Sequence, residues 1–159
     1  MAVDMFMKID DVAGGSAVTG REGWIDVISW NWGMTQTGTM HESSGGGAGK
    51  VNVQDLTFTH NIDSSTPRMI ESCCTGKHYG VAQLAIRKAG GTALEYLSIK
   101  MEEVLISGVS SGGSGGGDIV TENVTLNFAR FTVDYTPQSG KGAGGAKITG
   151  TYDIAKGPK

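Results

Sequence analysis

The sequence predicts a mainly β fold, either a closed β-barrel or a tightly closed sandwich, with one short α-helix. Three observations predict it. About six to nine runs rich in β-branched, aromatic and other apolar residues are typical of strands. Helix signals occur in one segment only, and glycine-rich tracts separate the runs. Because no linker divides the 159 residues evenly, we expect a single domain over residues 1–159.

The strands are predicted from alternating side-chain polarity along the chain. The first covers Val3 to Ile9 and the second Trp24 to Trp32. A third, Val51 to His60, changes parity near Gln54–Asp55, which suggests a bulge there. The later strands are expected at Val81–Lys88, Leu94–Ser107, Ile119–Tyr135 and Ile148–Ile154. A closed arrangement of these strands would remove free edges that otherwise aggregate.

The helix is predicted after Ser64–Ser65–Thr66, whose hydroxyls suit a helix N-terminus, and Pro67 fits the first helical position. An apolar stripe follows at helical spacing: Met69, Ile70, Cys73 and Cys74. Gly76 stands where a left-handed C-terminal cap belongs. The adjacent cysteines have poor geometry for a disulfide and poor spacing for a metal, which fits a reducing compartment.

Charge and hydropathy exclude several partners. The net charge of −3, without a Lys/Arg cluster, argues against nucleic acid. No segment approaches the roughly 20 apolar residues of a membrane span, so we expect no direct membrane insertion. The N-terminal residues lack a basic region followed by an apolar core, so no ordinary signal peptide is expected and synthesis is cytoplasmic.

One glycine-rich stretch imitates a phosphate-binding loop. It consists of Ser43, Ser44, Gly45, Gly46, Gly47, Ala48, Gly49 and Lys50. Gly49–Lys50 fill the Gly-Lys step, but Ser44 stands where the first glycine belongs and Val51 where the magnesium-binding hydroxyl belongs. A strand pattern follows instead of a helix N-terminus. We therefore expect no nucleotide and no other cofactor.

Catalytic and metal-binding patterns are sparse. The three histidines, His41, His60 and His78, have no second histidine at metal spacing, so no metal site is expected. No Gly-x-Ser-x-Gly elbow occurs, although a triad assembled from distant residues remains open. We expect no catalytic residues and no enzyme activity.

Alternation places Trp24, Trp30 and Trp32 on one face of the second strand, with Ile25, Val27, Ser29 and Asn31 on the other. Core packing of the tryptophans is favoured over a ligand-binding platform. A strand that is apolar on one side and polar at Ser29 and Asn31 suits a wall between a core and water. In a monomer that water is bulk solvent, and in a ring it fills the lumen.

Seven blocks, in order along nearly the whole chain, carry a family resemblance. They are the initial Met-Ala-Val-Asp-Met-Phe-x-Lys-Ile, Ile25-Asp-Val with Trp30-x-Trp-Gly-Met34, Gly46-Gly-Ala-Gly-Lys-Val-Asn-Val-Gln-Asp-Leu56, Ser65-Thr-Pro67, Gly76-Lys-His-Tyr79, Ile86-Arg-Lys-Ala-Gly-Gly91 and Thr121-Glu-Asn-Val-Thr-Leu-Asn-Phe-Ala129. Together they resemble the haemolysin co-regulated protein (Hcp) family. Departures lie in Val12–Gly23 and after Gln138.

The resemblance implies a β-barrel with one helix on its side, similar to phage tail-tube proteins. It implies a tube subunit of the bacterial type VI secretion system, forming hexameric rings that stack head to tail. The implied partners are further copies of the chain, sheath, spike and baseplate proteins, and small effector proteins carried in the lumen. The tube would be secreted to the extracellular space or into a target cell without a cleaved signal peptide.

Two functional surfaces follow. Strand alternation assigns Ser29 and Asn31 to the lumen, while the resemblance assigns Met40–Lys50, with Ser43 to Lys50 at its centre, to a loop that reaches the adjacent ring. Two other functions compete with the tube. One is a monomeric β-barrel that binds a ligand through the tryptophans, and the other is a hydrolase with a triad hidden in the fold.

Overall fold

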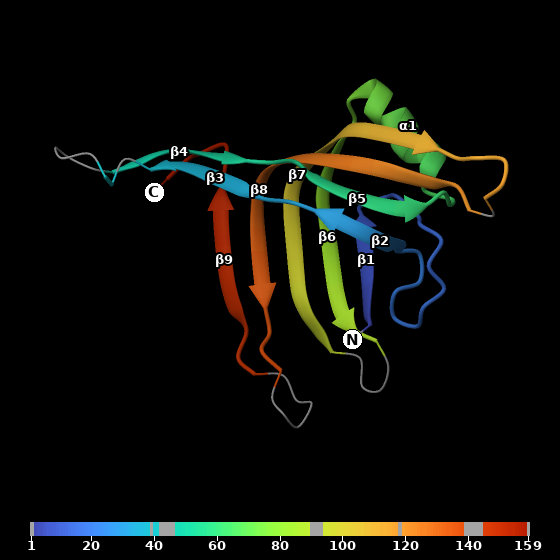
Figure 1. The fold of residues 1–159 in the computed structure, drawn as a ribbon, viewed down its shortest axis with the longest axis horizontal. Helices are drawn as coiled ribbons and strands as arrows, with labels where there is room; N and C mark the ends of the chain where they lie inside the picture. Colours follow the sequence, from blue (N-terminus) through green and yellow to red (C-terminus); the bar gives the residue numbers. More distant parts are fainter. Residues whose placement is uncertain are drawn as a thin grey trace.

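The computed structural model describes residues 2–38, 40–41, 47–89, 94–117, 119–138 and 145–158. Its elements are β1 (Val3–Ile9), β2 (Ile25–Asn31), β3 (Met34–Gly38), β4 (Ala48–Val53), β5 (Leu56–Asn61), α1 (Thr66–Thr75), β6 (His78–Lys88), β7 (Glu95–Gly112), β8 (Thr121–Tyr135) and β9 (Ile148–Asp153) (Figure 1). The mainly β prediction is confirmed.

The strands close into an antiparallel barrel. Their order in the main sheet is β5-β2-β1-β6-β7-β8-β9, and β5 also pairs with β8, so that the first six strands form a closed cylinder. Closure depends on the length of β8: its first part pairs with β5 up to Leu126, and its later part pairs with β9 from Arg130. The barrel is confirmed over the sandwich, while β9 extends the sheet outside the cylinder.

The barrel interior is filled by aliphatic and aromatic side chains. Fully buried members include Met7, Ile9, Ile25, Leu56, Phe58, Leu84, Ile99, Met101, Ile106 and Leu126. They come from all six barrel strands, as a sheet with one face against a core requires. In β7 the buried parity changes between Met101 and Val104, beside Glu103, whose φ is 54°. Burial of large apolar side chains is the main favourable contribution to folding.

Helix α1 lies on the side of this barrel and contacts β7 (Figure 1). Its predicted C-terminal glycine is confirmed, because Gly76 is left-handed (φ 70°) and its N–H donates to the Ser72 carbonyl. The N-terminal prediction needs a correction: Ser65 makes no side-chain cap bond. The hydroxyls instead join a wider network: the Ser65 hydroxyl donates to the Asp63 carboxylate, and the Thr66 hydroxyl accepts from the Asp63 N–H.

One predicted strand is divided in the structure, and one strand of the structure was not predicted. The third predicted strand is divided into β4 and β5, and the interruption falls at Gln54–Asp55, where the bulge was expected. The residues after Trp32 contain a strand, β3, that alternation did not predict. All five of its residues are exposed, so no buried position marks it in the sequence.

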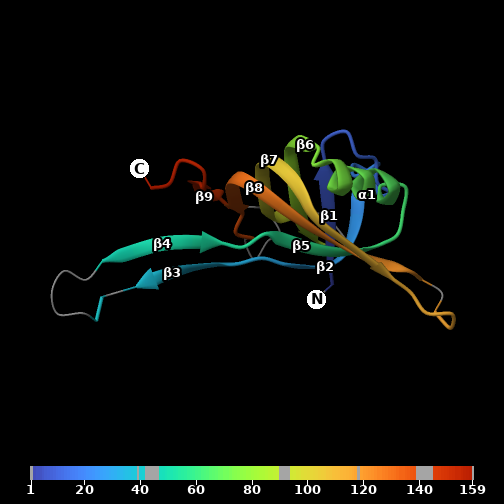
Figure 2. The ribbon, with the colours of Figure 1, turned by 90° about the horizontal axis from the view of Figure 1, so that it is seen from above.

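The paired strands β3 and β4 form a separate two-stranded sheet (the β3–β4 hairpin, residues 34–53). It continues the direction of β2 and β5 and projects away from the barrel (Figure 2). A hydrogen bond from the Gln54 N–H to the Gly33 carbonyl, 2.9 Å, ties its base. Two-stranded hairpins are marginally stable alone, so the projecting part gains stability from any surface that packs against it.

Candidate functional site

A polar face covers the outside of four adjacent strands, β2, β5, β8 and β7. Strand register aligns two rows of side chains across it: Ser29, Thr59, Asn123 and Ser110 in one, and Asn31, Thr57, Thr125 and Gly108 in the other. Ser29 and Asn31 are exposed, as the sequence predicted for positions outside the core. We call these two rows the polar face.

Hydrogen bonds within the polar face hold its side chains in place. The Thr57 and Thr125 hydroxyls lie 3.2 Å apart, and the Thr59 hydroxyl donates to Asn123 Oδ1 at 2.5 Å. Neither row contains a charged residue. The polar face therefore offers water or a neighbouring molecule hydroxyl and amide groups without a net charge.

A carboxylate borders the polar face. Asp55 accepts 2.8 Å hydrogen bonds from the Ser107 hydroxyl and from Asn127 Nδ2. These bonds connect the β4–β5 junction to β7 and β8, at the point where the hairpin leaves the barrel. The direction of the hairpin is thus coupled to the sheet that carries the polar face.

The tryptophan prediction is partly wrong, because β2 contains a bulge. The register of β2 with β5 shifts between Val27 and Ser29. As a result Trp30 packs on the core side together with Ile25 and Val27, although simple alternation puts it on the opposite face. Trp32 also packs against the core and donates from Nε1 to the Gln54 carbonyl at 2.9 Å.

Trp24 lies outside the core. The Arg21 guanidinium sits over its ring, 4.4 Å from the centroid. Of the three tryptophans, two are therefore packing residues and one lies beneath a cation. The chain does not gather them into the ligand platform that the binding-barrel alternative requires.

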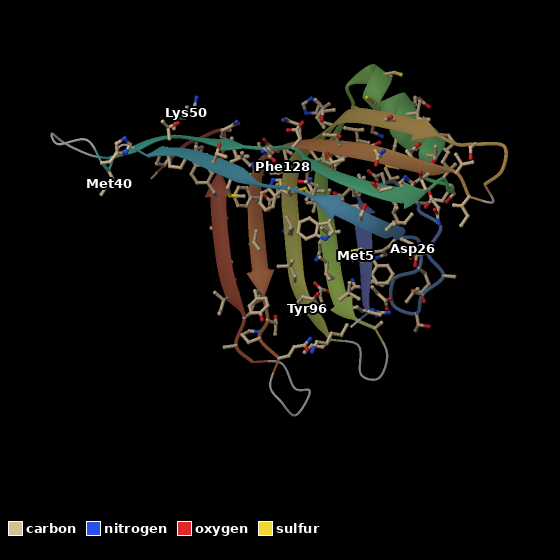
Figure 3. The ribbon with its side chains drawn as sticks, in the orientation of Figure 1. Met5, Asp26, Met40, Lys50, Tyr96 and Phe128 are labelled. Carbon is tan, nitrogen blue, oxygen red and sulfur yellow. The ribbon has the colours of Figure 1, made fainter. Side chains whose placement is uncertain are left out.

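The hairpin contains the glycine-rich stretch. Ser43, Ser44, Gly45 and Gly46 lie outside the described residues. Ala48, Gly49 and Lys50 belong to β4, a strand and not the start of a helix, which agrees with the rejection of a phosphate-binding loop. Gly49 is required by packing, because a Cβ there would lie 2.6 Å from the Thr37 carbonyl oxygen. Figure 3 shows Lys50 and Met40 on the hairpin, away from the barrel.

The histidines do not come together. His41 and His78 are exposed, whereas His60 is fully buried and its Nε2 lies 2.9 Å from Glu122 Oε1. Sequence reasoning missed this pair, since the two residues are 62 positions apart. The described residues contain no group of three His, Cys, Asp or Glu side chains that could hold a metal. No described helix is long and apolar enough to span a membrane.

Comparison with known proteins identifies the family. The model of the family described as "Type VI secretion system effector, Hcp" matches residues 6–135. Protein hcp1 of Pseudomonas aeruginosa is 60% identical over 144 residues, which cover 90% of this chain and 89% of that protein. The crystal structure of Hcp1 from Salmonella typhimurium is 33% identical and covers 99% of both chains, with a TM-score of 0.81.

Another solved structure, described as a type six secretion system protein, gives a TM-score of 0.93 at 25% identity and also covers 99% of both chains. Members of this family are structural tube proteins and secreted effectors, and the family is not enzymatic. The fold, the order of the matching residues and the identity to these relatives agree along nearly the whole chain. The chain therefore belongs to the Hcp family of the type VI secretion system.

Proposed function

We propose that this chain is the repeating subunit of a type VI secretion tube. Residues 1–159 act as one β-barrel unit, hexameric rings of this unit stack head to tail, and the tube is expelled with small effector proteins in its lumen. The observation that carries the proposal is the polar face, which has an open strand edge on each side.

The open edges belong to β2 and β7. β2 pairs with β1 only at Ile25 and Asp26, so from Ser29 to Asn31 its one described partner is β5. β7 pairs with β6 no further than Leu105, and over Gly108–Gly112 its one described partner is β8. Open edges recruit further strands. When the β2 edge of one copy meets the β7 edge of the next, the contact repeats and closes a ring.

The polar face then becomes the wall of the lumen, with Ser29 and Asn31 directed at the cargo. Hydroxyl and amide groups without net charge hold water well and repel neither acidic nor basic proteins. Such a wall lets an effector enter and leave, since it forms no strong ion pairs with it. This supports transport of small effectors rather than their tight storage.

The hairpin stretch from Ser43 to Lys50 is proposed as the ring-stacking loop. Ordering such a stretch against a neighbour costs about 1 kcal/mol per residue in backbone entropy. Stacking of isolated rings is then weak, and tubes form at high protein concentration or inside the sheath. The remaining partners are the sheath, spike and baseplate proteins, and the chain leaves the cytoplasm through the secretion system without a cleaved signal peptide.

Solution mass tests the proposal directly. Light scattering on the purified chain, with negative-stain images of the same sample, should give the mass of a hexamer and rings with an open centre. A monomer at every accessible concentration, even in the presence of the sheath proteins, would contradict the proposal.

A deletion separates rings from tubes. Removal of Gly45 to Gly49 should abolish tubes and leave ring mass unchanged, because the hairpin lies outside the barrel and the two open edges. Loss of the rings together with the tubes would show that this stretch serves ring closure and not stacking.

A further inference from the structure

A second outer face of the barrel carries charged side chains. It belongs to the layer formed by β1, β6, the first part of β7, the later part of β8, and β9, which stand side by side in Figure 1. Leu84, Ile99, Met101 and Phe131 are buried on the core side of this layer. The residues that alternate with them therefore point outward, on the other layer from the polar face.

Ion pairs join neighbouring strands at both margins of this layer. Arg87 Nε of β6 lies 3.6 Å from Asp4 Oδ2 of β1. Lys147 Nζ, just before β9, lies 3.8 Å from Asp134 Oδ2 of β8. Opposite charges at neighbouring positions of adjacent strands attract each other, so each margin is neutral.

Four charges form a connected group at the centre. Glu102 of β7 accepts a 2.5 Å hydrogen bond from Arg130 Nε of β8, and Lys100 Nζ lies 3.5 Å from the other oxygen of the same carboxylate. Arg130 Nη1 lies 3.3 Å from Glu103 Oε1. Two bases thus stand beside two acids, and the group is also neutral.

The segment before β2 adds a further pair, because Arg21 Nη2 lies 2.5 Å from Glu95 Oε2. Two charges at outward strand positions lie outside these pairs. Lys8 Nζ lies 5.8 Å from the centre of the Trp24 ring, and the Asp153 carboxylate accepts from a backbone N–H. These two charges have opposite signs, so they leave the balance unchanged.

We call the surface from the Asp4–Arg87 pair to the Asp134–Lys147 pair the paired face. Its acidic and basic side chains are equal in number, whereas the whole chain carries a net charge of −3. Opposite charges a few ångströms apart cancel within a distance shorter than the screening length of about 8 Å in physiological salt. A neighbouring protein therefore finds no region of one sign, and an exposed side chain that exchanged its partner would gain little.

The paired face and the polar face avoid ionic contacts in different ways. The two rows of the polar face contain no charged residue. The paired face contains many, but nearly all of them are bound to an opposite charge of the same chain. Exposed charges of mixed sign hold water and keep a surface soluble.

We propose that the paired face is a sliding surface, which is turned toward the inner wall of the sheath and forms no ionic contact with it. The inference rests on the proposed tube function, in which the polar face lines the lumen and the other layer is the exterior. A tube that is expelled must break every contact with its sheath. Because contacts repeated in each subunit add along the tube, even one weak ion pair per subunit would retain it.

Charge reversal and charge exchange test the sliding surface. Lys147→Glu and Asp134→Lys each break one pair and leave an excess of opposite sign, whereas Lys147→Glu/Asp134→Lys restores the pair in the reverse orientation. Ring mass and melting temperature are checked first. Sheath–tube complexes are then isolated from cells that produce each variant, and the chain retained after washes from about 50 to about 500 mM NaCl is quantified.

Wild-type retention should change by less than about twofold over this range, because there is no ionic contact for salt to screen. At low salt the single variants should differ from the wild type by about tenfold, one upward and the other downward, since the excess charge is repeated in every subunit. The double variant should behave as the wild type does. Glu71→Lys is the matched control, because it reverses a charge on the exposed side of α1, outside the paired face.

Four results, with rings intact, would overturn the proposal. Release of the wild type by salt would reveal an ionic contact, and single variants that match the wild type would show that pairing has no effect. A double variant that behaves as a single one would show that the sheath recognises Lys147 or Asp134 itself. Equal retention of Glu71→Lys and Asp134→Lys would assign the effect to the total charge of the chain.

Flotation with lipid vesicles separates this proposal from the tube function, because it requires neither rings nor sheath. Lys147→Glu should bind cationic vesicles, and Asp134→Lys phosphatidylglycerol vesicles, about fivefold more than the wild type, while the double variant equals the wild type. Absence of rings from the wild-type chain would overturn the tube function alone. Equal binding by the single and double variants would show that the pairs do not neutralise this surface, and would overturn the sliding surface.

Discussion

His60 Nε2 lies 2.9 Å from Glu122 Oε1, and both side chains are completely buried. The pair joins the end of β5 to the start of β8. Hydroxyls complete the site: Ser111 Oγ donates to Glu122 Oε2 at 3.2 Å, and Thr66 Oγ1 lies 3.4 Å from Oε1. The Glu122 carboxylate on β8 thus contacts β5 through His60, β7 through Ser111, and the first turn of α1 through Thr66.

Truncation of His60 should destabilise the barrel strongly. In His60→Leu the Glu122 carboxylate stays buried without its main partner, which costs about 3–5 kcal/mol of unfolding free energy. His60→Leu/Glu122→Leu should recover part of this loss, because no uncompensated charge remains. Urea unfolding at one protein concentration measures both, with the exposed His78→Leu as the control. Equal stability of His60→Leu and the wild type would contradict the buried pair.

The ion pair of Glu102 and Arg130 predicts a dependence on pH. The hydrogen bond from Arg130 Nε, at 2.5 Å, lowers the pKa of the Glu102 carboxyl from its ordinary value. A carboxyl whose pKa is lower in the folded state stabilises the fold at pH values above its unfolded-state pKa of about 4.3. This contribution is lost as the pH falls through the folded-state pKa. The melting temperature of Glu102→Gln should therefore lie below that of the wild type at neutral pH, with the difference shrinking in acid.

The matched control for this pH series is Glu71→Gln, on the exposed side of α1. It should follow the wild type from neutral pH into acid, because Glu71 makes no ion pair with the described residues. A difference between Glu102→Gln and the wild type that stays constant over the whole range would contradict the pKa assignment.

Period-two alternation predicted much of this fold because burial follows it closely in the barrel. In β5, Leu56, Phe58 and His60 are buried while the residues between them are not. In β1 the predicted bounds agree with the structure, and Met7 and Ile9 are buried on the predicted face, but Phe6 on the opposite face is buried as well. The helix was readable because Pro67 and the left-handed Gly76 mark its ends. Such signals are local, so they need no knowledge of which strands become neighbours.

Alternation failed where burial does not alternate or where contacts are distant. All of β3 is exposed, and the bulge in β2 moves Trp30 into the parity of the core. The partnership of His60 with Glu122 depends on the pairing of β5 with β8, which closes the barrel. Closure was expected from the number of strands and the glycine-rich turns between them, whereas nothing in the residues of β5 or β8 indicates that these two strands pair.

Gly49→Ala should disturb the hairpin without affecting the barrel. Its Cβ would lie 2.6 Å from the Thr37 carbonyl oxygen, so β3 and β4 must separate. Gly38→Ala is the matched control on the same hairpin, where a Cβ meets nothing within 4 Å. Hydrogen exchange should show faster exchange of hairpin amides in Gly49→Ala only, with ring mass unchanged and tubes lost. Equal exchange in both variants would contradict the pairing of Gly49 beside Thr37.

Asn31→Arg should reduce the retention of cargo by the rings while leaving ring mass unchanged. The polar face holds no charge in either row. An arginine at position 31 of each subunit would project into the lumen of the ring, and a hexamer would gain six like charges there. Co-purification of a small effector protein expressed with the rings measures retention, and light scattering measures ring mass. Thr75→Arg, at the exposed end of α1, adds the same charge outside the lumen and should retain cargo as the wild type does. Equal retention by Asn31→Arg and Thr75→Arg would remove the Asn31 side chain from the cargo-facing wall. Loss of the rings in Asn31→Arg would show that this side chain, and not the β2 backbone alone, takes part in the edge contact between copies.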